Sequence, residues 1–192
     1  MQRVNRRNFL IFIVLVSFLP FLSAEDRRTV PLDLYLIIDD SEAFLTVKDN
    51  AIAWVNEQVL DRLLMEGDSV TVWTAGDSAQ ILYSGEISSL DVKKDIQDKL
   101  KAIGTAGKTA NFASALRELE PVLSKTPQNR MPYSVLVTAS AVGLRTAFTG
   151  NSQSLLKWFR TEKYERWQAL IIAPDIGPRV SQTASTYMNS MR

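Results

Sequence analysis

The chain has 192 residues, of which 46% are hydrophobic and 22% charged, and its net charge is +1. Such a length and composition are typical of one globular domain and exclude fibrous and low-complexity proteins. The chain contains no histidine and no cysteine, which excludes Ser-His-Asp triads, cysteine nucleophiles, disulfides and Cys/His zinc sites. Any site chemistry therefore depends on carboxylates, hydroxyls, Lys, Arg or a hard cation bound by oxygen atoms.

The amino-terminal segment has the composition of an export signal. Residues 1–8 contain three arginines and no acid, residues 9–22 are apolar except for one serine and one proline, and Ser23 and Ala24 follow. We predict that residues 1–24 are a secretory signal peptide. As a helix, residues 9–22 would be about 21 Å long, shorter than the roughly 30 Å hydrocarbon core of a membrane. An uncleaved signal anchor is the alternative.

The remaining residues, 25–192, are expected to form a single exported domain. Removing the signal takes away three of the 22 basic residues and none of the 21 acidic ones, which leaves a net charge of −2. This net charge does not indicate binding to nucleic acid or to an anionic membrane surface, which favours an excess of basic residues. The lack of cysteine favours a bacterial periplasm or cell envelope, because other secreted domains often carry disulfides. No membrane span is expected after signal removal.

Short apolar runs alternate with amphipathic helices along this domain. Strands are predicted at 33–38, 69–74, 80–87, 133–138 and 167–173. Helices are predicted where apolar residues recur every three or four positions, within 47–63, 92–103, 112–123, 151–159 and 180–191. This order predicts an α/β three-layer sandwich, with a mostly parallel sheet, helices on both faces and strand 80–87 as an antiparallel edge strand. The four tryptophans are expected in the core: Trp54, Trp73, Trp158 and Trp167.

Three motifs lie near the strand ends, where such sheets bind ligands. Each lacks a part that its function requires. Residues 102–109 (AIGTAGKT) match a relaxed Walker A pattern, but a P-loop follows a strand, and this segment follows a predicted helix. Residues 37–41 and 135–139 are similar to parts of response-regulator receiver domains, whose further Asp and Lys are missing here. Ser154 and Lys157 have the spacing of a Ser-Lys dyad without its partner motifs.

Three other segments resemble von Willebrand factor A domains, in the order and on the elements of that family. Residues 34–43 (LYLIIDDSEA) resemble its first strand and D-x-S-x-S loop, and residues 104–116 (GTAGKTANFASAL) resemble its Gly-Thr loop. Residues 135–140 (VLVTAS) resemble the strand that usually ends in Thr-Asp-Gly. The resemblance extends over about residues 30–190. It implies an Mg²⁺ or Mn²⁺ site with hydroxyl ligands, carboxylates that act mostly through water, and a carboxylate from the partner.

The metal site that this resemblance implies is degenerate. Asp39, Ser41 and Thr109 match family positions, whereas Ala43 replaces the second serine and Ala139 the second aspartate. Losing a direct oxygen ligand and a carboxylate predicts weakly bound Mg²⁺ or Mn²⁺, or no cofactor. Without a metal, Asp39 is expected to be a buried carboxylate that accepts backbone N–H groups. Ser41 and Thr109 would then cap a loop and a helix.

The function that the resemblance implies is non-catalytic protein binding. Such domains have no catalytic constellation, and this chain has no histidine or cysteine to form one. We expect an exported module that binds a protein partner in the cell envelope through a surface containing Asp40, Glu42 and Ser140. The alternative is a hydrolase that uses Asp39, Asp40 or Glu42 with a metal, which requires a cavity beside Asp39.

Overall fold

The computed structural model describes residues 28–104, 107–139 and 166–172. Their centre is a five-stranded sheet with the order β3-β2-β1-β4-β5. Its strands are β1 (Leu32–Ile38), β2 (Ser69–Ala75), β3 (Ala79–Glu86), β4 (Met131–Val137) and β5 (Gln168–Ile172). β1 pairs in parallel with β2 and β4, β4 pairs in parallel with β5, and β3 is antiparallel to β2. The predicted mostly parallel sheet with an antiparallel edge strand is confirmed.

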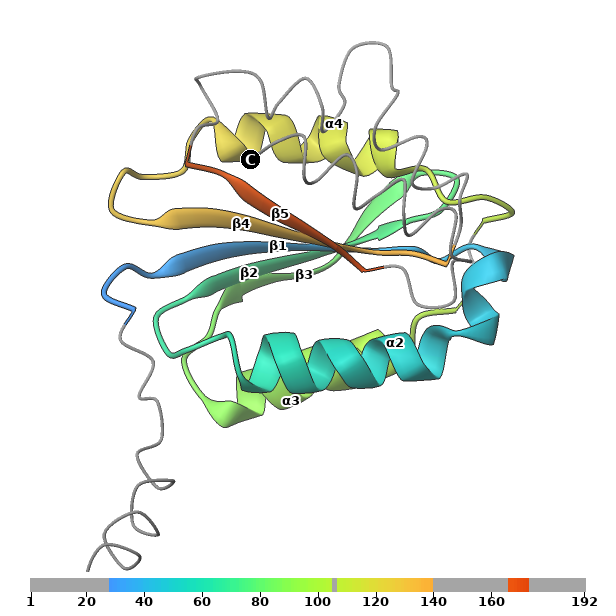
Figure 1. The fold of residues 1–192 in the computed structure, drawn as a ribbon, viewed down its shortest axis with the longest axis horizontal. Helices are drawn as coiled ribbons and strands as arrows, with labels where there is room; N and C mark the ends of the chain where they lie inside the picture. The colour runs from blue at the N-terminus through green and yellow to red at the C-terminus, as the bar shows by residue number, and fades with distance from the viewer. Residues whose placement is uncertain (1–27, 105–106, 140–165, 173–192) are drawn as a thin grey trace, which may run out of the picture.

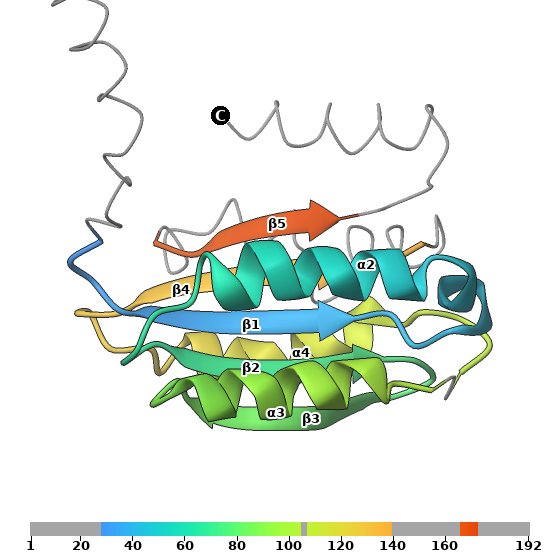
Figure 2. The ribbon, with the colours of Figure 1, turned by 90° about the horizontal axis from the view of Figure 1, so that it is seen from below.

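Helices cover both faces of this sheet (Figure 1). One face carries η2 (Glu42–Thr46), α2 (Lys48–Trp54), η3 (Val55–Asp61) and α3 (Leu90–Lys101), and the other carries α4 (Phe112–Leu123). Figure 2 looks onto the first face, with α2 and α3 in front of the sheet and α4 behind it. The three layers confirm the predicted sandwich. Helices lie on both faces because the apolar side chains of each sheet face must be covered.

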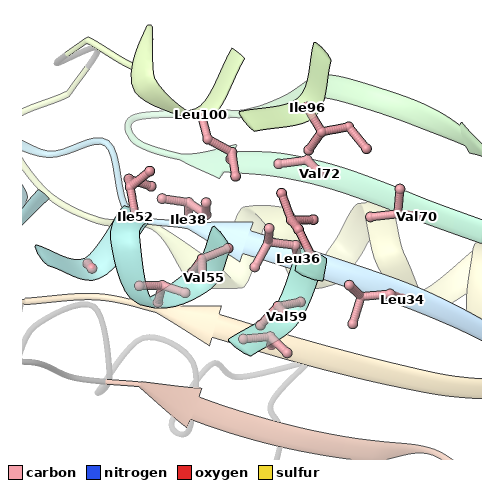
Figure 3. Packing of buried hydrophobic residues seen from close by; sticks show 14 of the residues in the cluster. Leu34, Leu36, Ile38, Ile52, Val55, Val59, Val70, Val72, Ile96 and Leu100 are labelled. Atoms are coloured by element: carbon pink, nitrogen blue, oxygen red, sulfur yellow. The ribbon is translucent and has the colours of Figure 1, made fainter. Parts of the chain in front are cut away.

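β1 lies between two hydrophobic clusters. All seven of its residues are buried. Leu34, Leu36 and Ile38 belong to the cluster beneath α2, η3 and α3 (Figure 3), and the alternate residues Tyr35 and Ile37 belong to the cluster beneath α4. Each fully buried aliphatic side chain stabilises the fold by about 1.5–3 kcal/mol. The apolar run of β1 is therefore explained by its two covered faces.

The first predicted helix, over 47–63, differs from a single α-helix. The segment starts as a 3₁₀ turn, continues as α2 and widens into the π-helix η3. At its end the N–H groups of Leu63 and Leu64 both donate to the Val59 carbonyl, at 3.2 and 3.0 Å. A four-residue apolar period fits both windings, so the pattern cannot separate them. Gly67 follows with φ of 89°, a conformation that favours glycine, and the chain then enters β2.

The remaining helices agree with the pattern where the structure describes them. Pro121 lies inside α4, and the helix ends two residues later at Leu123. The predicted signal peptide 1–24 and the predicted helices within 151–159 and 180–191 lie outside the described residues. No helix in the described part of the chain has the length and apolar composition needed to cross a membrane.

Three tryptophans confirm the predicted core positions. Trp73 and Trp167 are buried in the cluster beneath α4, and Trp54 packs against the cluster beneath α2. Trp167 also donates from Nε1 to the Ser134 hydroxyl at 2.7 Å, which satisfies its polar atom inside the core. Trp158 lies outside the described residues.

Candidate functional site at the carboxyl edge

The sheet ends in a group of loops that we term the carboxyl edge: residues 39–42 after β1, 75–77 at the end of β2, 107–109 before α4, and 138 after β4. In sheets of this kind, ligands bind at this end of the parallel strands. Ser41 forms an isolated parallel bridge with Gly107, and the Glu42 N–H donates to the Gly107 carbonyl at 3.1 Å. The loops after β1 and before α4, which are far apart in sequence, are thus joined.

Asp39 is a fully buried carboxylate with both oxygens engaged. Its Oδ1 accepts the Ser41 N–H at 2.8 Å, and its Oδ2 accepts the Thr138 hydroxyl at 2.6 Å. Its own N–H donates to the Val137 carbonyl at 2.9 Å. A buried carboxylate is costly unless such hydrogen bonds compensate it. Asp39 therefore ties the end of β1 to the end of β4, and the expectation of a buried, backbone-bonded carboxylate is met.

Asp40 is also buried, at 4% exposure, but it is less well satisfied. Burial raises the pKa of its carboxyl, the hydrogen bond from Thr74 opposes that shift, and the nearby carboxylates of Asp39 and Asp77 add to it. Its Oδ1 has no hydrogen-bond partner. Asp40 thus keeps an unsatisfied acidic group just below the surface of the carboxyl edge.

Two glycines allow the loops to pack this closely. A Cβ at Gly76 would lie 2.2 Å from Asp40 Oδ1, and a Cβ at Gly107 would lie 2.7 Å from the Asp77 backbone nitrogen. A side chain at Gly107 would push the loops apart, and one at Gly76 would displace the Asp40 carboxylate. Gly107 and Thr138 were named only as parts of the segments 104–116 and 135–140, and no contact of Gly76, Gly107 or Thr138 was predicted from the sequence. A glycine directly after a strand was the available signal for Gly76, since such glycines often mark close backbone approach.

The other predicted site residues are placed differently. Ser41 is buried beside Asp39, and its Oγ has no hydrogen-bond partner, so its side chain does not cap η2. Thr109 is exposed; it does not cap α4, because Asn111 does so by accepting the Ser114 N–H at 3.2 Å. The expected capping roles of both residues are therefore wrong. Glu42 is exposed on the rim, and Ser140 lies outside the described residues.

The residues at this edge supply part of the oxygen set that the family's metal site needs. Ser41 Oγ is buried and unpartnered, as a residual ligand would be. Both Asp39 oxygens, however, already accept hydrogen bonds. Ala43 has no oxygen in its side chain to bind a metal, and Ala139 packs against the hydrophobic cluster beneath α2, η3 and α3. Mg²⁺ takes about six oxygen ligands in near-octahedral geometry. The described residues bring no three acidic, His or Cys side chains together as a metal-binding group.

A cavity of 220 Å³, which we term the α3-side cavity, opens beside Asp40 rather than Asp39. It lies on the face of the sheet that carries α3, between Thr74 on β2, Gln80 to Leu82 on β3, and residues 102–104 after α3. The Walker A match at 102–109 follows α3 and not a strand, which confirms the predicted order of elements.

Comparisons with known proteins agree with this architecture. No family model matches the chain. An uncharacterised protein of Treponema pallidum (strain Nichols) is 21% identical over 174 residues, which covers 86% of this chain and 78% of that protein.

Two solved structures are similar in fold. One is a von Willebrand factor type A protein from Catenulispora acidiphila, with a TM-score of 0.50, 12% identity, and coverage of 84% of this chain and 42% of that one. The other is proximal thread matrix protein 1 from the mussel byssus, with a TM-score of 0.52, 12% identity, and coverage of 75% and 37%. This chain spans less than half the length of either structure. At such identities the likeness shows the fold and nothing of the activity.

Proposed function

This chain has the fold of a von Willebrand factor A domain, and we propose that it is a non-catalytic protein-binding module whose partner contacts the carboxyl edge. We also propose that it is exported to a bacterial periplasm or cell envelope, because residues 1–24 have the composition of a signal peptide. The net charge of −2 without that segment supports a protein partner rather than nucleic acid.

The observation that carries the binding proposal is an exposed rim on a rigid base. Asp39 ties β1 to β4 beneath the surface, and the Asn111 N–H donates to the Ala75 carbonyl at 3.0 Å, which ties the start of α4 to β2. Above this base the side chains of Glu42, Asp77 and Thr109 are exposed. Loops held in this way lose little conformational entropy when a partner binds, which favours affinity.

The same geometry argues against Asp39 as the acid or base of the hydrolase alternative. Asp39 is fully buried and both of its oxygens accept hydrogen bonds within the protein, so it is not placed to exchange a proton with a substrate. The cavity at this edge measures 220 Å³, below the roughly 300–1,000 Å³ of ordinary small-molecule sites.

We propose that Mg²⁺ or Mn²⁺ binds this edge weakly or not at all. Asp39, Ser41 and Thr109 would be the protein's contribution to such a site, and the ion would supply a positive charge to hold a partner's acid. Ala43 and Ala139 remove one oxygen ligand and one negative charge from that set. The partner is therefore expected to bind through contacts that need no metal.

Site-specific photo-crosslinking tests the location of the binding surface. A benzophenone amino acid replaces Glu42, exposed at the carboxyl edge, or Gln128, exposed in the loop between α4 and β4 at the opposite end of the sheet. In the cells that produce the protein, we expect discrete high-mass adducts from position 42 and none from position 128. Adducts from position 128 alone, or from neither position, would overturn the proposal.

A further inference from the structure

β3 is an edge strand with little charge to oppose pairing, although its register with β2 shifts between Ile81 and Tyr83. It is an outer strand of the five-stranded order and lies at the margin of the sheet in Figure 2. Its eight residues, AQILYSGE, contain no lysine or proline and a single charge, Glu86. Ile81, near its middle, is 64% exposed. Edge strands normally carry charges, prolines, bulges or covers that hinder another strand from pairing with them; Gln80 and Ile81 lie on the regular part of β3, before its register shift.

Two cavities flank β3, one on each face of the sheet. Ile81 is paired with Trp73 and Gln80 is paired with Thr74, so the side chains of Ile81 and Gln80 lie on opposite faces. The α3-side cavity, of 220 Å³, contains Gln80 and Thr74. The α4-side cavity, of 410 Å³, is lined by Trp73 and by residues at the end of α4, and Ile81 lines both cavities. A strand added beside β3 would direct successive side chains alternately toward these two cavities.

The two cavities differ in chemistry. Tyr35 and Trp73, whose ring centroids are 6.0 Å apart, line the α4-side cavity together with Pro121 and Val122 of α4. Asp33, Glu118 and Lys125 also line it. Its aromatic and apolar part suits a bulky apolar side chain.

The α3-side cavity differs in having a buried acid without an ion pair to a described cation. Its acidic group is Asp40, buried, unpaired at Oδ1, and close to the carboxylates of Asp39 and Asp77. No described Lys or Arg forms an ion pair with Asp39 or Asp40. The cavity therefore suits a cationic side chain, which would supply the missing counter-charge and a donor to the carboxylate.

We propose that the partner is an extended segment that pairs with β3 and places a Lys or Arg side chain in the α3-side cavity and a neighbouring apolar side chain in the α4-side cavity. This inference rests on the protein-binding role proposed above and names the partner's chemistry. Main-chain hydrogen bonds to an edge strand give affinity in this mode, and the pockets for alternate side chains give specificity. The partner would thus contribute a basic side chain, whereas the partner of a metal-bridged site contributes a carboxylate.

A random nonapeptide library displayed on phage and selected on the purified chain tests the proposal. We expect enrichment of peptides in which a basic residue adjoins a bulky apolar residue. A synthetic peptide from this set should bind at least tenfold more tightly than its Lys→Glu counterpart, because the introduced acid would face Asp40. Enriched peptides without a basic residue, or no enrichment at all, would overturn the proposal.

Three variants locate the site. Asp40→Asn keeps the shape of the side chain and removes its charge, and Gln80→Lys places a cation at the mouth of the α3-side cavity. Each should weaken the selected peptide at least tenfold. Asn50→Lys replaces another exposed amide by lysine, on α2 and outside both cavities, and should leave affinity unchanged. Equal affinity for all three variants would overturn the site, provided that circular dichroism shows each is folded.

Two further outcomes separate this inference from the proposed function. Adducts from position 42 together with peptides insensitive to Asp40→Asn would retain the binding role at the carboxyl edge and reject the β3 mode. A concentration-dependent dimer in sedimentation equilibrium, abolished by Gln80→Lys, would identify a second copy of the chain as the occupant of β3 and overturn the basic-peptide partner.

Discussion

The buried acids at the two ends of the sheet differ in their partners: those at the amino end form ion pairs with arginines, and those at the carboxyl end form none with a described cation. At the amino end, Asp33 is paired with Arg130 and Asp68 with Arg28. Asp68 also accepts the N–H groups of Leu32 and Met65, each at 2.8 Å. Its two oxygens thus hold the start of β1, the turn before β2 and an arginine in one network.

At the carboxyl end, Asp39 and Asp40 are buried without an ion pair to any described cation. Asp39 is compensated by hydrogen bonds, and Asp40 only in part, with Oδ1 unpartnered. The amino end is therefore built for stability, because its charges cancel within the chain. The carboxyl end keeps an excess of negative charge that costs stability and that a bound cation would neutralise.

The largest effect is expected from breaking the amino-end network. Asp68→Ala removes the ion-pair partner of Arg28 and the acceptor of two backbone N–H groups, and should lower the free energy of unfolding by about 3–5 kcal/mol. Urea denaturation followed by circular dichroism measures it. Asp98→Ala, on the exposed side of α3, is the control and should change stability by less than about 0.5 kcal/mol. Equal losses in the two variants would show that the network has no special role.

A smaller loss is expected from the hydrogen-bonded acid at the carboxyl end. Asp39→Ala removes the acceptor for Ser41 N–H and Thr138 Oγ1 and should cost about 2–3 kcal/mol. The same urea titration checks it, with the exposed neighbour Glu42→Ala as the matched control. An Asp39→Ala protein as stable as the control would contradict the role of Asp39 as a tie between β1 and β4.

Substitution of Asp40, whose Oδ1 has no hydrogen-bond partner, should raise the free energy of unfolding rather than lower it. Asp40→Asn removes a charge whose burial raises the pKa of the carboxyl, so the free energy of unfolding at pH 7 should rise by up to about 1 kcal/mol. Asp77→Asn, an exposed acid of the same edge, should change it by less than about 0.5 kcal/mol. A clear loss of stability in Asp40→Asn would mean that the chain itself compensates Asp40, and the contrast between the two ends would fail.

The smallest effect is expected from divalent cations. A ligand at about 100 times its dissociation constant stabilises a protein by about 2.7 kcal/mol, which raises Tm by several degrees. For millimolar Mg²⁺ or Mn²⁺ we expect a change in Tm of less than about 1 °C relative to EDTA, because the site lacks ligands. Ser41→Ala removes the buried, unpartnered hydroxyl and should leave both Tm and this comparison unchanged. A rise of several degrees that disappears in Ser41→Ala would reveal a working metal site despite Ala43 and Ala139.

Much of the fold could be predicted from local patterns. The apolar run that becomes β1 indicated a strand covered on both faces, and the alternation in 69–74 indicated β2. The site was predicted only in outline: Asp39 was correctly expected to be buried. The roles of Thr138 and Gly76 were not predicted, because Asp39 Oδ2 meets a hydroxyl 99 positions away and Gly76 matters through its contact with Asp40.

The layers of this protein follow from its local patterns, because the hydrophobic period of each segment specifies its secondary structure and the face that it must bury. The composition excludes histidine and cysteine chemistry. The satisfaction of Asp39 and the unpartnered oxygen of Asp40, the next residue, are properties of the folded chain. So is the position of β3 between two cavities. Those properties arise from contacts between loops and strands far apart in the chain, which no local pattern records.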